Sequence, residues 1–386
     1  MNDFDRDLCC KLRDLVNSTN VFWKDKREKP YYNHLCAMMD RVDESMGYII
    51  KHTDTPKTND ELVLFITHTC IIRDSIKKVM ELLGIRYNLI TKELPAYLSN
   101  FYNQAPFDSS VKLTDDTIFN YLRSISCAHP LDTETNYITK EILHAKHCSP
   151  FLLLDRGLCY KGNVGVYVYS DTSDNPVSIQ VSYSDLLEYT CSRYSLLKYI
   201  IEELDKRLHT KEEQWKQRKV VVDPDPVVRL TDIKSILEER FEHAYDIDEL
   251  ISMLTCKYTR QENASIVTQV QQELISRIPA ICDAIDNMDT EAAYQNYKDI
   301  LYSRPSDMHD GADYELEKIF CCLNNDSRYG DQMFGKMMAK LFTKGFARKW
   351  VVMDIDNMSF EEIQMLTRFA CFMEKQDQDR KKKDNV

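Results

Sequence analysis

An arginine and a histidine lie six positions apart at the end of a predicted helix, at Arg123 and His129. Histidine can move a proton near neutral pH, and arginine can bind a phosphate and stabilise the negative charge that develops on it. A pair of this kind suits the cleavage of RNA without a metal ion. The residue types therefore predict a phosphodiester-cleaving site formed by Arg123 and His129.

The spacing alone is common, because comparable pairs also occur at Arg27–His34 and Arg304–His309. Those two pairs lie close to prolines in loop-like sequence. The pair at Arg123 and His129 instead follows an apolar stripe with i, i+4, i+7 spacing, which is typical of an amphipathic helix. This stripe consists of Ile118, Leu122 and Ile125.

Helical geometry leaves two interpretations of the pair. Six residues of an ideal helix turn by about 600°, so the two side chains would point about 120° apart and would not meet at one phosphate. Pro130 disfavours helical geometry at His129, so the helix is expected to end there and the imidazole can turn away from the apolar stripe. The two side chains could also meet at one phosphate if a second copy of the chain supplies one of them. Alternatively, His129 extends the apolar stripe into the core and Arg123 faces solvent.

The elements that would position this pair are predominantly helical. Apolar residues recur every three or four positions through residues 1–148, which predicts a bundle of antiparallel helices. The clearest stripe lies in the third helix and ends at Gly84. The predicted helices are 3–21, 29–52, 59–84, 92–104 and 115–128.

Residues 149–222 differ in pattern. Val177, Ile179, Val181 and Tyr183 alternate with polar residues, as in a half-buried strand, and a turn-rich stretch separates them from VGVYVYS at 164–170. These segments predict a small antiparallel β-hairpin. A long helix is expected to follow, with Ser184 as its N-cap.

The prolines in VVVDPDPVV (Val220–Val228) cannot sit inside a helix, so they indicate a boundary. We expect residues 223–386 to form a C-terminal helical domain with a frayed, highly charged tail from Gln376. The predicted helices are 231–241, 246–256, 263–286, 290–302, 311–324, 329–348 and 359–375. The predicted fold is thus mainly α, with a β-hairpin inserted between two helical regions.

The N-terminal bundle together with RSISCAH (Arg123–His129) resembles the HEPN superfamily, in which an arginine, a polar residue and a later histidine form an R-x5-H type of motif. This resemblance implies a dimeric, metal-independent endoribonuclease of a bacterial defence or toxin type. Arg123 and His129 would be catalytic, and Ser124 would take the place of the polar neighbour, which is often Asn or Asp in the family. Support from a neighbouring helix is also common.

Arg73, Asp74 and Lys77 on the third predicted helix are candidates for that support. An ordinary solvated helix face is the alternative interpretation of these three residues.

A second candidate site is basic. Lys recurs every four residues in GKMMAKLFTKGFARKW and could follow a phosphate backbone from one helix face, with Met337, Met338, Leu341 and Phe342 towards the core. Solvated surface is again the alternative, and Gly345 is positioned to break the stripe. The nucleic-acid-binding candidates are Lys336, Lys340, Lys344 and Arg348.

Composition limits the remaining possibilities. A net charge of −12 and a pI near 5.3 argue against a protein coated in basic surface. Thirteen scattered cysteines and no recognisable signal peptide or membrane span indicate a cytoplasmic protein with reduced thiols. HAKHC (His144–Cys148) lacks the second ligand pair of a zinc site, and no glycine-rich phosphate loop is present, so no metal and no cofactor are expected.

Two functions remain open on the sequence alone. The first is a metal-independent endoribonuclease that acts on RNA as a homodimer. The second is a non-enzymatic interaction or regulatory protein of a defence system, with the C-terminal domain binding a protein partner. The first function is favoured if His129 and Arg123 line an open cleft or meet the same residues of a second copy, and the second function is favoured if His129 is fully buried against Ile118, Leu122 and Ile125.

Overall fold

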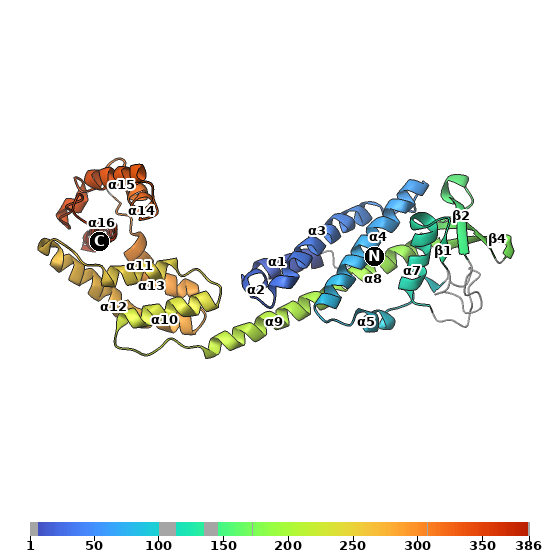
Figure 1. Ribbon diagram of the computed structural model, residues 1–386, viewed down its shortest axis with the longest axis horizontal. Coiled ribbons are helices and arrows are strands. Elements are labelled where there is room, and N and C mark those ends of the chain that lie inside the picture. The colour runs from blue at the N-terminus through green and yellow to red at the C-terminus, as the bar shows by residue number, and fades with distance from the viewer. Residues whose placement is uncertain (1–6, 100–112, 135–145, 172, 307, 385–386) are drawn as a thin grey trace. The chain divides into compact units, whose positions relative to one another are not determined.

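The computed structural model describes residues 7–99, 113–134, 146–171, 173–306 and 308–384. The chain is mainly α-helical and carries one small antiparallel β-sheet, as the sequence predicts (Figure 1). Contacts divide it into two compact units, residues 1–209 and 210–386. The boundary falls inside helix α9 (Leu197–Gln217). Each unit has its own hydrophobic core.

The first unit is a bundle in which α3 packs against α4 and α4 packs against α8 (Figure 1). The apolar stripe of the third predicted helix is buried, with Leu62, Ile72 and Ile76 fully enclosed. The helices before the sheet and directly after it are α1 (Leu8–Asn17), α2 (Val21–Lys24), α3 (Lys29–Lys51), α4 (Asn59–Leu82), α5 (Tyr87–Glu93), α7 (Asp115–Arg123) and α8 (Tyr183–Tyr194).

The helix predicted at 92–104 is interrupted in its described part. Helix α5 ends at Glu93, and residues 94–98 are not helical. Leu94 is extended, with ψ of 151°, because the proline that follows it disfavours helical geometry. The remainder, from residue 100, lies outside the described residues.

The sheet has four strands in the order β1-β2-β3-β4, with β1 (Thr133–Glu134), β2 (Lys146–Leu152), β3 (Asn163–Ser170) and β4 (Ser173–Ser182). The predicted hairpin is β3–β4, paired with Val166 opposite Ile179. One face of this pair is buried in the core with the helices, through Val164, Val166, Val168, Ile179 and Val181.

The predicted long helix begins earlier than expected and is interrupted. Ser182 rather than Ser184 is the N-cap of α8, because its side chain accepts a hydrogen bond from the Asp185 amide at 3.4 Å. The helix then stops at Tyr194, where Ser195 forms the C-cap, and α9 begins at Leu197.

Helices are the only regular elements that the structure describes in the second unit. Its predicted frayed tail is wrong, since α16 runs to Asp384. The tail is anchored where Asp377 pairs with Lys349 at 2.6 Å and Gln378 accepts from the Ser306 amide at 2.7 Å. The α-helices after α9 are α10 (Pro226–Glu239), α11 (Tyr245–Thr255), α12 (Ala264–Asp286), α13 (Thr290–Tyr302), α14 (Ala312–Cys322), α15 (Tyr329–Phe342) and α16 (Phe360–Asp384).

None of the described helices combines the length and the apolar character needed to cross a lipid bilayer.

Candidate functional site

The end of α7 carries the predicted catalytic residues. Thr114 caps the helix by accepting from the Thr117 amide, and Arg123 is its last α-helical residue. A π-helical turn, Ser124–Ala128, follows and is closed by a 2.8 Å hydrogen bond from the His129 amide to the Ser124 carbonyl. Single π-helical turns of this kind are rare and often lie at functional sites.

His129 leaves the helix as expected for a residue before proline. Its backbone has φ of −141° and ψ of 56°, and its side chain is exposed. Two contacts hold the segment, since the Thr133 hydroxyl donates to the His129 carbonyl at 2.7 Å and the Ser149 amide donates to the Pro130 carbonyl at 2.6 Å. The buried stripe of α7 therefore ends before His129, which does not extend it into the core.

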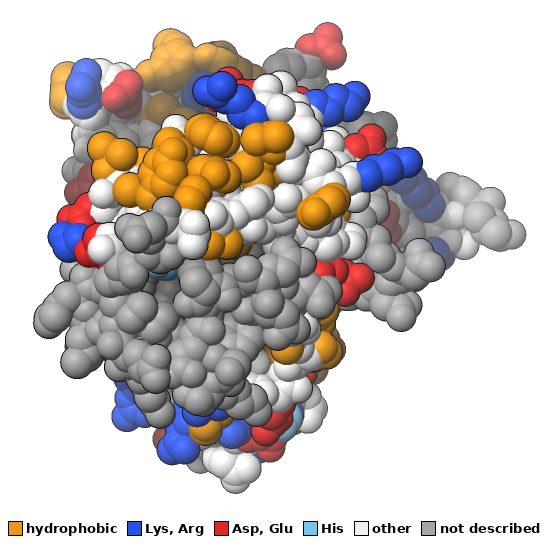
Figure 2. Space-filling model, turned by 90° about the vertical axis from the view of Figure 1, so that its right-hand side faces the viewer, with side chains coloured by type: hydrophobic (Ala, Val, Ile, Leu, Met, Phe, Trp, Pro, Cys, Tyr) orange, Lys and Arg blue, Asp and Glu red, His pale blue; other side chains and the backbone are white. Residues whose placement is uncertain are grey.

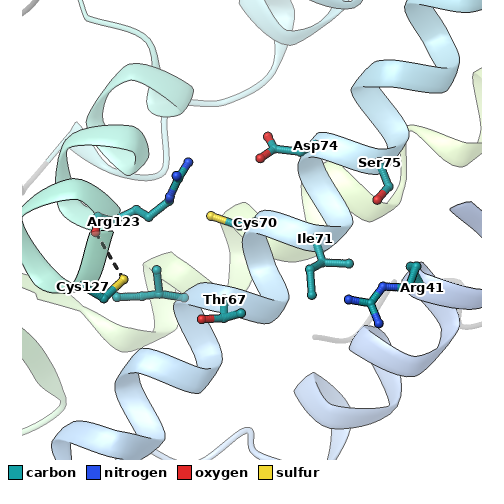
Figure 3. Close-up of a pocket in the computed structure, with 9 residues that line it drawn as sticks. Arg41, Thr67, Cys70, Ile71, Asp74, Ser75, Arg123 and Cys127 are labelled. Carbon is teal, nitrogen blue, oxygen red and sulfur yellow. Dashed lines mark hydrogen bonds between the residues drawn. The ribbon is translucent and has the colours of Figure 1, made fainter. Parts of the chain in front are cut away.

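Arg123 lies at a pocket between α7, α4 and α3. The pocket has a volume of about 410 Å³, and Figure 3 shows the Arg123 side chain reaching across it towards the α4 side that carries Asp74. The Arg123 guanidinium forms no hydrogen bond or ion pair with any residue that the structure describes. Besides Arg123 and Asp74, the pocket is lined by Arg41, Ile66, Thr67, Cys70, Ile71, Ser75 and Cys127.

Asp74 is already paired within its own helix. Arg73, which is 4% exposed, binds the Asp74 carboxylate through Nε and Nη2, each at 2.7 Å. The solvated-face interpretation of Arg73 is therefore wrong, although Asp74 itself is exposed and reaches the pocket. Lys77 lies elsewhere, with its ammonium 5.5 Å from the centre of the Tyr87 ring.

His129 does not line the Arg123 pocket. The third predicted residue, Ser124, has its hydroxyl 3.2 Å from that of Thr133 and is likewise absent from the lining. One chain thus places Arg123 at the pocket and His129 on the surface beyond the π-helical turn, without bringing the two side chains into a single site.

The two thiols at this pocket are poor nucleophiles. Burial raises the pKa of Cys70 to about 11, and burial also raises the pKa of Cys127 against the opposing effect of Arg123. The Cys127 thiol donates to the Arg123 carbonyl at 3.3 Å (Figure 3). Since only a thiolate is strongly nucleophilic, the chemistry of the pocket rests on its cations.

A buried polar network behind the pocket is not evident from the sequence. Asp116 on α7 accepts hydrogen bonds from Tyr87 and Tyr189 at 2.8 Å each and from Arg193 Nε at 2.7 Å. Burial raises the pKa of Asp116, but the ion pair with Arg193 and these hydrogen bonds outweigh burial and lower it. Asp116 therefore stays charged and joins α5, α7 and α8.

The sequence around Asp116 gives only the signal of an acidic first helical turn after Thr114, which helix capping explains by itself. Its partners lie up to 77 positions away, so no local spacing reports them.

The HAKHC stretch falls partly outside the described residues, which exclude His144. His147 is 4% exposed, and its Nδ1 lies 2.7 Å from the Tyr121 hydroxyl. Burial lowers the pKa of His147, so it is neutral at physiological pH. In the described part of the chain, no three His, Cys, Asp or Glu residues gather as metal ligands.

The predicted basic stripe is divided in the structure. Lys336 and Lys340 lie on α15, which ends at Phe342, whereas Lys344 follows the helix and Arg348 lies in a 3-10 turn (Phe346–Lys349). Lys340 is paired with Asp356 at 2.7 Å, and the Lys336 ammonium lies 5.8 Å from the centre of the Phe360 ring.

The expected packing of α15 is half wrong. Met338 and Phe342 are buried, but Met337 and Leu341 are exposed. The core lies on the side of α15 that faces α14, so the four apolar residues fall on two different faces of the helix.

No family model, curated protein or solved structure matches this chain.

Proposed function

We propose that the first unit is a metal-independent endoribonuclease in which Arg123 binds the scissile phosphate and His129 transfers the proton. One observation carries this proposal: the Arg123 side chain lies at an open pocket and its guanidinium has no partner in the described chain, while His129 is exposed just beyond the same helix. The resemblance of the motif to the HEPN superfamily supports a cytoplasmic enzyme of a bacterial defence or toxin type.

The chemistry follows from these two side chains. His129 accepts the proton of an RNA 2′-hydroxyl, whose oxygen then forms a bond to the adjacent phosphorus. The bond from phosphorus to the 5′-oxygen of the next nucleotide breaks, and that oxygen takes up a proton from water, to which His129 in turn releases the proton that it accepted. The charge that builds on the phosphate is stabilised by Arg123, which no described carboxylate neutralises. DNA lacks the 2′-hydroxyl and is not a substrate.

The site is completed by a second copy of the chain. His129 does not line the pocket that holds Arg123, so both groups reach one phosphate when His129 of one protomer lies at the pocket of the other. A two-fold homodimer forms two such sites, because each protomer supplies one residue to each.

The test is cleavage of a labelled single-stranded RNA in the presence of EDTA. We expect the wild type to cleave it, and His129→Ala to remove cleavage while leaving the folded state intact by circular dichroism. His34→Ala is the matched control, because His34 is also exposed and follows an arginine in the same bundle. Cleavage of the DNA version of the oligomer, or cleavage unchanged by His129→Ala, contradicts the proposal.

The second candidate function is a non-enzymatic interaction protein, and one observation favours it. Exposed apolar residues recur every four positions along α15, at Tyr329, Met333, Met337 and Leu341. Lys336 flanks this stripe, whereas Lys340 is already paired with Asp356. The stripe fits an amphipathic helix of a partner protein that carries an acidic edge. A crosslinker at position 333 would then capture one defined partner in cells, and Met337→Lys would abolish its capture. A wild type that lacks ribonuclease activity but shows this capture favours the second function.

A further inference from the structure

The outward face of the β-sheet carries a row of aromatic side chains. Phe151 on β2 is paired with Tyr167 on β3, and Tyr169 lies two residues further along β3, on the same face. The opposite face of the sheet is buried against the helices. Figure 2 shows hydrophobic side chains gathered at the end of the first unit, where Figure 1 places the sheet.

We name Phe151, Tyr167 and Tyr169 the aromatic ladder. The Phe151 and Tyr167 rings are stacked, with centroids 5.2 Å apart and planes inclined by 10°. The Tyr169 ring meets Tyr167 edge to face at 5.7 Å and is 45% exposed. The Arg156 guanidinium lies 4.9 Å from the centre of the Phe151 ring. A guanidinium and three rings therefore follow one another across two strands.

A neighbouring loop extends this surface. The side chain of Gln180 on β4 accepts a hydrogen bond from the Tyr160 amide at 2.9 Å and donates one to the Leu158 carbonyl at 3.3 Å. These bonds hold the loop that precedes β3 against the sheet. Leu158 and Tyr160 are both exposed. A side chain on Gly165 would meet the Gln180 side chain at 2.9 Å, so glycine is required for this arrangement.

Two cations lie near the ladder, and the exposed carboxylate of Asp171, two residues after Tyr169, accepts a hydrogen bond from the Lys146 amide. Arg156 and Lys161 are exposed, and neither forms an ion pair with a residue in the described part of the chain. Asp155, next to Arg156, accepts a hydrogen bond from the Asn59 amide instead. Aromatic rings with unneutralised cations at their side match the two parts of a nucleic-acid strand, since bases stack on rings and phosphates pair with cations.

We propose that the aromatic ladder, with Arg156 and Lys161, binds a segment of single-stranded RNA. Bases stack on the exposed ring of Tyr169 and on the half-buried ring of Tyr167, and the backbone phosphates contact the two cations. This inference deepens the proposed ribonuclease function and rests on it for the choice of RNA. The ladder holds the strand and positions it, whereas Arg123 and His129 cleave it.

Binding is tested apart from cleavage by using the His129→Ala protein in EDTA. The assay is fluorescence anisotropy of a labelled 12-nucleotide single-stranded RNA with the full chain. We expect Tyr169→Ala to weaken binding by about 5-fold or more, as loss of one stacked base implies, and Arg156→Ala to reduce its salt dependence. Tyr169→Phe should bind like the parent, because it keeps the ring.

Tyr329→Ala is the matched control, because Tyr329 is an exposed tyrosine of the second unit. It should leave the affinity unchanged. Equal binding by the parent and Tyr169→Ala, or no RNA binding at all, overturns the proposal. So does conversion of a dimer into a monomer by Tyr169→Ala without loss of RNA affinity, because a second copy would then cover the ladder.

The two proposals fail in different ways. If the ladder binds RNA but the wild type does not cleave it, the ribonuclease proposal fails and the ladder remains an RNA-binding surface. If the wild type cleaves RNA while Tyr169→Ala and Arg156→Ala retain the affinity of the parent, the ladder proposal fails and the ribonuclease proposal stands.

Discussion

Replacing Asp116 by asparagine tests the buried network that anchors α7. The substitution keeps the shape of the side chain but removes the negative charge that Arg193 requires. Arg193 is 2% exposed, so water cannot replace the lost partner. Leaving one member of a buried ion pair uncompensated costs about 3–5 kcal/mol. Asp116→Asn should therefore lower the free energy of unfolding of the first unit by about that amount.

The assay is urea unfolding, detected by hydrogen exchange with mass spectrometry, because peptides from each unit report the unfolding of that unit separately. The free energy of unfolding of the second unit should be unchanged. Asp205→Asn, at an exposed carboxylate on α9, should have little effect on the stability of either unit.

Because the pKa of Asp116 is lowered in the folded chain, its contribution to stability is present above the unfolded pKa, near 4, and is lost as the pH falls through the folded pKa. The gap between wild type and variant should narrow in acid. A difference below about 0.5 kcal/mol at pH 7 refutes the account of the network, since that is within the range of an ordinary surface substitution.

Three further predictions concern stability. The folded chain holds the pKa of His147 below its usual value, so protonation of His147 opposes folding. The free energy of unfolding of the first unit should therefore fall by up to about 1.4 kcal/mol per pH unit below about pH 6.5. His147→Gln should make this free energy less dependent on pH when unfolding is measured at several pH values. Gly165→Ala would place a methyl group 2.2 Å from the Ile179 carbonyl oxygen and should lower the free energy of unfolding by about 1–3 kcal/mol. Deleting residues 376–386 should destabilise the second unit by about 1 kcal/mol or more, because Gln378 is buried and holds a backbone amide; an unchanged urea midpoint contradicts the anchored tail.

Local patterns predicted the elements whose residues bury one face. The stripe of α4 and the alternation in β4 depend only on helical and strand periodicity, so both could be located from the sequence. The end of the helix at His129 was predictable from Pro130, because proline restricts the residue before it. These features need no knowledge of distant contacts.

Features that depend on distant contacts were missed. The tail after Gln376 is highly charged, and its sequence alone does not show that Asp377 and Gln378 meet Lys349 and Ser306. Asp116 likewise looks like a helix-capping acid, because its tyrosine and arginine partners come from other helices. The π-helical turn after Arg123 was also not predicted, since its side chains follow no distinct spacing.

The composite site is tested most directly by mixing two inactive variants. Arg123→Ala and His129→Ala chains are co-expressed with different tags, and heterodimers that carry both tags are purified. One of the two sites in such a dimer keeps both residues, so the account predicts that each variant alone is inactive and that the heterodimer regains about half of the wild-type RNA cleavage in EDTA. A heterodimer as inactive as its parents would contradict a site shared between two chains.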